Sequence, residues 1–119
     1  MMGLNQELHT FRLVYLTSNT TILGELVAVN QFGILLKDPV TVNCNDDKVF
    51  FNLFFNGTSE DRTFPFTTNN VISFGKPSDT ILQHYNDFIA KVVPEIKEFN
   101  KQLANTEVVI KYNTHNTLH

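Results

Sequence analysis

The chain has 119 residues, of which 42% are hydrophobic and 18% charged, and its formal net charge is −3. This composition predicts one folded domain and argues against a disordered chain. No apolar run approaches the roughly 20 residues of a membrane-spanning helix, and we see no secretory signal. The negative balance also argues against nucleic-acid binding that depends mainly on phosphate contacts.

Residues 1–77 predict a β domain, because apolar side chains alternate or run together in short segments between polar turns. The expected strands are 8–16, 21–29, 34–42, 49–55, 63–68 and 71–74. Gly24 lies inside the second strand, where a missing side chain permits a sharp bend. Gly33 ends the following turn and can take a positive φ. Pro39 lacks a backbone N–H, so the third strand should bend or lie at an edge there.

Residues 78–104 predict an amphipathic helix, because apolar residues recur at spacings of three and four. Ser78 is a favourable N-cap. Pro94 removes a hydrogen bond and clashes with the preceding turn, so we expect a kink, or two helices that meet near Val93. Residues 105–119 are expected to form a short strand or a flexible tail.

Two segments resemble the two sequence motifs of the Sm/LSm family, which includes the bacterial Hfq type and Sm-like proteins of phages. In the first segment, Gly24 is followed by alternating apolar residues and Asn30. A turn, the apolar residues 34–36 and the acid Asp38 come next. The second segment, residues 66–74, is similar to a strand, a tight turn and a short closing strand. The resemblance implies a mainly β fold, a five-stranded and strongly bent antiparallel Sm-like (SH3-type) barrel. The kinked C-terminal α-helix expected here departs from the family, which usually places a helix before the first strand.

The resemblance extends over roughly residues 11–74 and implies a closed homomeric ring of about five to seven subunits. Strand 63–68 of one subunit would pair with strand 71–74 of the next. The helix would cover the open end of the barrel or pack between subunits. The expected interface consists of apolar side chains on the two pairing strands: Phe64, Phe66, Val71, Ile72 and Phe74.

The resemblance also implies a surface for RNA or single-stranded DNA, on which Phe32 aligns with the family's base-stacking residue. The expected nucleic-acid contacts are Asn30, Gln31, Phe32, Thr68, Asn69 and Asn70, with Arg12, Lys37 and Arg62 for phosphates. Two positions depart from the family: Gly33 replaces an Asn, and Thr67-Thr68 replaces Arg-Gly. Structural alternatives remain, since Phe32 suits a subunit interface and the Asn pair suits a simple turn.

No motif predicts catalysis, so we expect no enzyme, no cofactor and no metal site. The four histidines, His9, His84, His115 and His119, lie far apart and lack metal-binding spacing. The single Cys44 suits a reducing compartment, and we expect a cytoplasmic protein, or one of the host cytoplasm if the source is viral. The alternative to nucleic-acid binding is a homo-oligomeric structural or assembly protein, as in a virus.

Overall fold

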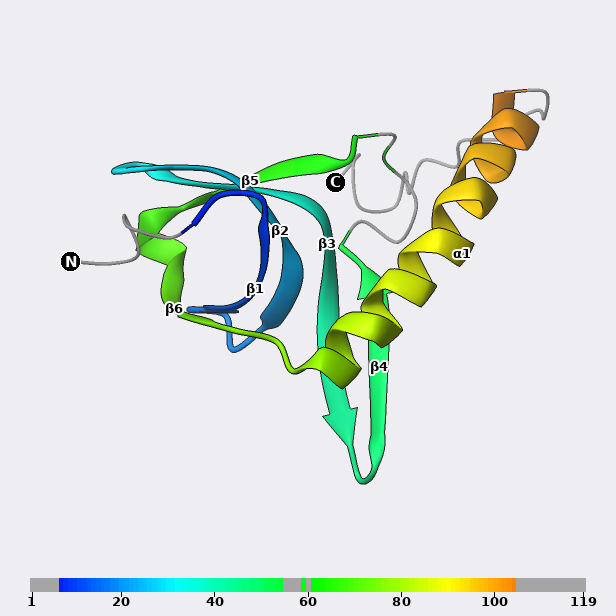
Figure 1. Ribbon diagram of the computed structural model, residues 1–119. Helices are drawn as coiled ribbons and strands as arrows, with labels where there is room; N and C mark the ends of the chain where they lie inside the picture. The colour runs from blue at the N-terminus through cyan, green and yellow to red at the C-terminus, as the bar shows by residue number, and fades with distance from the viewer. Residues whose placement is uncertain (1–6, 55–58, 60, 105–119) are drawn as a thin grey trace, which may run out of the picture.

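The computed structural model describes residues 7–54, 59 and 61–104. It is a mainly β protein with six antiparallel strands and one C-terminal helix (Figure 1). In chain order the elements are β1 (Thr10–Leu16), β2 (Thr21–Asn30), β3 (Gly33–Asn45), β4 (Lys48–Leu53), β5 (Thr63–Thr67), the 3₁₀ helix η1 (Thr68–Asn70), β6 (Val71–Gly75) and α1 (Asp79–Ala104). All six predicted strand segments are confirmed, whereas the expected last strand falls in residues 105–119, outside the described residues.

The sheet has the strand order β4-β3-β2-β1-β6, and β5 pairs with β3. The 13-residue β3 serves two partners along one edge: its first half pairs with β5 and its second half with β4. The sheet thus has the six strands that the segments predicted, and not the five strands of the barrel that the family resemblance implied. The sixth strand arises because β3 continues past its bend into a hairpin with β4, which projects from the curled sheet (Figure 1).

The bend in β3 lies opposite Gly24. The β2–β3 register shifts there, so that Asp38 and Pro39 together face one residue of β2. A Cβ on Gly24 would lie 3.0 Å from the carbonyl oxygen of Lys37, so a larger residue would press against the backbone. Asp38 takes the left-handed φ of 50°, and the buried Pro39 needs no ladder N–H at a bulge. The predicted bend at these residues is confirmed.

Alternating apolar side chains form an inner core between the strands. Its buried members are Val14, Leu16, Ile22, Leu26, Ile34, Leu36, Phe66 and Val71. Phe66 and Val71, two of the predicted interface residues, are thus buried within one chain, and their part in a subunit interface stays a prediction. Phe64 and Phe74 are half-buried against the same core. Of the five predicted interface residues, Ile72 is the most accessible, with 48% of its surface exposed.

The opposite face of the sheet forms a second core with the first half of α1. Leu23 of β2, Val40 of β3 and Tyr85 of α1 are its buried members. Half-buried side chains surround them on three strands and the helix: Phe11, Leu13, Val42, Phe51, Leu53, Ile81, Leu82, Phe88 and Ile89. The helix therefore covers the outer face of strands from its own chain, which neither expected docking position described.

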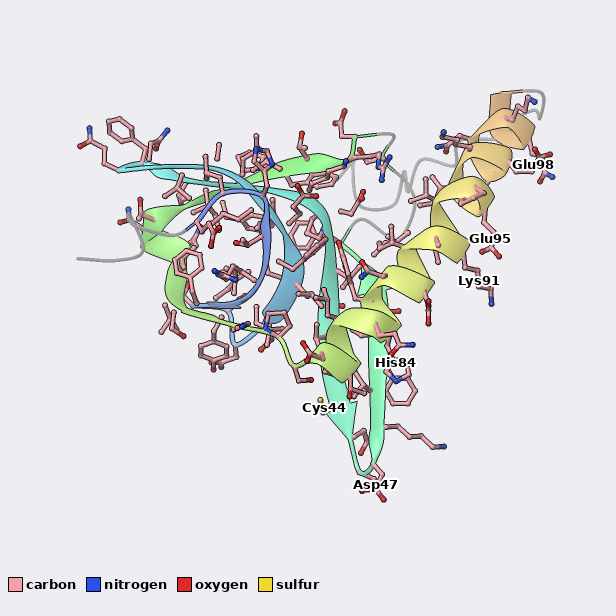
Figure 2. The ribbon with its side chains drawn as sticks, in the orientation of Figure 1. Cys44, Asp47, His84, Lys91, Glu95 and Glu98 are labelled. Atoms are coloured by element: carbon pink, nitrogen blue, oxygen red, sulfur yellow. The ribbon has the colours of Figure 1, made fainter. Side chains whose placement is uncertain are left out.

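α1 begins as its sequence predicts. The Oγ atom of Ser78 accepts a hydrogen bond from the backbone N–H of Ile81 at 3.2 Å, which confirms the N-cap. The helix continues through Pro94 to Ala104, so the alternative of two helices is wrong, whereas a kink stays a prediction. Lys91 and Glu95 project from the side of α1 that faces away from the strands (Figure 2). Within the described part of the chain, no helix is long and apolar enough to cross a membrane.

Candidate nucleic-acid interface

The β2–β3 turn presents Phe32 to solvent. The Oδ1 atom of Asn30 accepts hydrogen bonds from the backbone N–H groups of Phe32 at 2.7 Å and Gly33 at 3.1 Å. This arrangement fixes the turn backbone while the Phe32 ring points outward. Phe32 is 74% exposed, the highest value among the large apolar side chains that the structure describes.

The 3₁₀ helix η1 lies against this turn. The backbone N–H of Thr68 donates to the carbonyl oxygen of Phe32, and its hydroxyl donates to that of Gln31, both at 2.9 Å. Asn69 and Asn70 follow on the same short helix. The structure therefore brings together all six predicted contact residues, Asn30, Gln31, Phe32, Thr68, Asn69 and Asn70, which we call the Phe32 platform.

The side chains of the platform differ in their availability. Those of Asn30 and Thr68 hold the turn, and the Asn70 amide donates to the Thr67 hydroxyl at 3.0 Å. Within the described residues, the exposed side chains of Gln31 and Asn69 make no hydrogen bond. The platform thus offers one exposed ring and two exposed amides that make no hydrogen bond, Gln31 in the same turn and Asn69 on η1.

Gly33 is required for close backbone approach. A Cβ at this position would overlap with the carbonyl oxygen of Phe66 on the paired strand β5. Gly33 does not have a left-handed φ, so the positive φ that a glycine permits is not used in this turn. The glycine lets β5 lie close to β3 directly beside the exposed ring.

The three candidate phosphate contacts lie away from the platform. Lys37 is four residues from Gly33 along β3, a separation of about 13 Å. Arg12 pairs with Gly24 on the far part of β2 and donates to the carbonyl oxygen of Phe11 at 2.9 Å. Arg62 precedes β5 at the end opposite the platform. The structure therefore does not assemble these cations around Phe32.

Arg62 instead forms an ion pair with Asp38. Its Nε and Nη2 atoms donate to the two carboxylate oxygens at 2.9 and 2.6 Å, the bidentate geometry that suits a guanidinium. This hydrogen bonding raises the pKa of Arg62. The sequence singled out Asp38, but nothing in its local pattern indicated a partner 24 residues away.

Tyr85 connects α1 to the same residue. Its hydroxyl donates to the carbonyl oxygen of Asp38 at 2.7 Å, and its ring makes edge contacts with Phe11 and Phe51. The apolar stripe of the helix predicted that Tyr85 faces inward, but not which carbonyl its hydroxyl reaches. Asp38 thus joins the bend of β3, the segment before β5, and α1.

The burial of Tyr85 predicts a pH dependence of stability. Desolvation, followed by the negative charge of Asp38, raises the pKa of Tyr85 above the value of about 10 that is typical of an unfolded chain. The folded state therefore retains this proton longer, and the stability from Tyr85 is complete below about pH 10 and declines as the pH rises further. We expect this group to lower the free energy of unfolding by up to ~1.4 kcal/mol per pH unit above pH 10.

Urea unfolding at pH 9, 10 and 11 measures this decline. Tyr85→Phe should flatten it, whereas Tyr15→Phe, which changes an exposed tyrosine on β1, should leave it as steep as in the wild type. Equal slopes for Tyr85→Phe and the wild type would contradict the assignment.

A separate cavity of about 730 Å³ lies between the second half of α1 and the strands near Arg62. Phe54 and Phe64 form part of one wall, and Val93 and Ile96 part of the other. Its volume is within the usual range of small-molecule sites. The cavity is at the opposite end of β5 from Phe32, so it is not part of the platform.

Among the described residues, no group of three or more His, Cys, Asp or Glu side chains is placed to hold a metal ion. A comparison with models of protein families finds none that matches this chain, and a comparison with curated proteins finds no similar sequence.

Proposed function

We propose that this protein is an Sm-like ring protein that binds RNA or single-stranded DNA by stacking a base on Phe32. The observation that carries the proposal is the 74% exposure of this ring on a turn fixed by four hydrogen bonds. Because the backbone of this turn is already fixed, a base can stack on the ring without a further cost for ordering the turn. Stacking of this kind contributes about 1–3 kcal/mol per base.

The unpaired edges of β5 and β6 support the proposal that several copies of the chain form a closed ring. Among the described residues, β5 pairs only with β3 and β6 only with β1, so each retains one unpaired edge. Unpaired edges favour strand addition by another chain. In the proposed ring, β5 of one subunit pairs with β6 of the next, and about five to seven copies close by rotation. Such pairing uses backbone groups and does not need the buried Phe66 and Val71 side chains.

Binding is tested by titrating labelled oligo-U, oligo-A and single-stranded DNA and following fluorescence polarisation. Phe32→Ala should weaken binding about 5- to 140-fold, the equivalent of one lost stacking contact. Phe50→Ala is the matched control, because Phe50 is 47% exposed on the β3–β4 hairpin at the other end of β3. This variant should bind as the wild type does.

Native mass measurements on the same samples test the ring. A monomer at micromolar concentration would contradict the homomeric ring. A change of mass in Phe32→Ala would show that the Phe32 side chain lies in a subunit interface. If no oligonucleotide binds at low salt, the second candidate function applies: a homo-oligomeric structural or assembly protein. The net charge of −3 and the separation of the cations from Phe32 favour this candidate.

A further inference from the structure

We infer that the Phe32 platform recognises the bases of a single strand through uncharged contacts alone, leaving the phosphates in solvent. This inference rests on the proposed function and names the chemistry of its ligand. It predicts binding that is almost independent of salt, which distinguishes it from the phosphate-driven binding of most nucleic-acid proteins.

Among the described residues, the segments that form the surface around the platform contain no charged residue. Three sequence segments build it, residues 13–24, 26–36 and 63–75, and all three lack Asp, Glu, Lys and Arg. η1 joins them, because Thr68 bonds to the β2–β3 turn and the carbonyl oxygen of Asn70 accepts from Thr17 in the β1–β2 turn at 2.9 Å. The two turns and η1, with Thr67 before it, thus form a neutral rim, whose exposed polar side chains are Thr17, Ser18, Asn19, Asn30, Gln31, Thr67, Asn69 and Asn70.

The surrounding charges are too distant or of the wrong sign to hold a phosphate at Phe32. Along β3 the first charged residue is Lys37, whose Cα lies about 13 Å from that of Gly33. This backbone separation exceeds the Debye length of about 10 Å at 0.1 M salt. Lys37 also lies directly across from Glu25, which offsets its charge. Before β1, Glu7 is an acid that would repel a phosphate. Labelled charged side chains of α1 and the β3–β4 hairpin lie on the other side of the molecule (Figure 2).

The chemistry of the rim fits base edges. A side-chain amide both donates and accepts hydrogen bonds, as the edge of an unpaired base does. Gln31 precedes Phe32 in the turn and Asn69 lies on the short helix that bonds to this turn, and neither side-chain amide makes a hydrogen bond within the described structure. A base stacked on Phe32 can therefore meet polar partners without any contribution from its phosphate.

The experiment compares a labelled single-stranded DNA with a strand of the same sequence whose methylphosphonate backbone is uncharged. Each is titrated at about 50 mM and about 200 mM salt. We expect the two strands to bind equally well and the dissociation constants to change less than about twofold with salt. Three phosphate contacts on a single strand would instead weaken binding about 18-fold over this range.

Single substitutions test which side chains contact the bound strand. Gln31→Ala and Asn69→Ala should weaken binding by the same factor at both salt concentrations, whereas Lys37→Ala should bind as the wild type does. A steep salt dependence, or a methylphosphonate strand that binds at least tenfold more weakly, would overturn the inference while leaving base stacking on Phe32 intact. Absence of binding by both strands would instead overturn the proposed function itself.

Discussion

Replacing Tyr85 by alanine is expected to destabilise the protein by about 3–5 kcal/mol, the usual cost of removing a buried aromatic side chain. Tyr85 is 2% exposed and is the fully buried contribution of α1 to the second core. Its loss removes the edge contacts with Phe11 and Phe51 and leaves the carbonyl oxygen of Asp38 without its hydroxyl donor. Urea unfolding monitored by circular dichroism measures the change.

Tyr85→Phe separates the two contributions. It retains the ring and removes the hydroxyl, so it should cost about 1–3 kcal/mol, the penalty for an acceptor left without its partner. A loss as large as that of the alanine variant would show that the hydrogen bond dominates. A loss near zero for both variants would contradict the packing of α1 on the outer face of the sheet.

Replacing Gly33 by alanine is expected to destabilise the protein by about 1–3 kcal/mol or more, as overpacking does. The new Cβ would overlap with the carbonyl oxygen of Phe66, and a backbone atom in a paired strand cannot rotate away. β5 must therefore move away from β3. Because Thr68 and η1 follow β5 directly, the Phe32 platform should also distort and bind more weakly.

Two other glycines provide a graded control. A Cβ on Gly24 would lie 3.0 Å from the Lys37 carbonyl oxygen, so Gly24→Ala should cost less than Gly33→Ala. A Cβ on Gly75 would lie 3.7 Å from that of Leu13, an ordinary contact. Gly75→Ala should therefore be neutral or stabilise by about 0.4–1 kcal/mol, through loss of unfolded-state entropy. Any other order of the three melting temperatures would contradict the register of β3 with β2 and β5 or that of β6 with β1.

The predicted site residues illustrate how far sequence reasoning reaches. The turn chemistry of Asn30 and the exposure of Phe32 are local properties, so they were predictable. Thr68 entered the predicted site only through the family resemblance, and its hydrogen bonds with the turn were not predicted because they join distant segments. The phosphate role of Arg62 was predicted from its charge alone, whereas the structure commits that charge to Asp38.

Two of the predicted interface residues show a structural property that the sequence did not predict, the direction of their side chains. Phe66 and Val71 lie in short apolar strands, in which sequence alternation does not tell the inner face from an outer one when both are apolar. The direction of each side chain depends on the register with β3 and β1. Burial in the inner core follows from that register and not from the residues themselves.

The sequence by itself determined the six strand segments, the bend at Gly24 and Pro39, and the capped helix from Ser78, because alternation, backbone restriction and capping act within a few residues. The tertiary structure alone decided that β3 serves both β4 and β5, that α1 packs through Tyr85 on the outer face, and that η1 joins two neutral turns around Phe32. These features depend on pairing and packing between distant segments, whose free energy is not encoded in any local pattern.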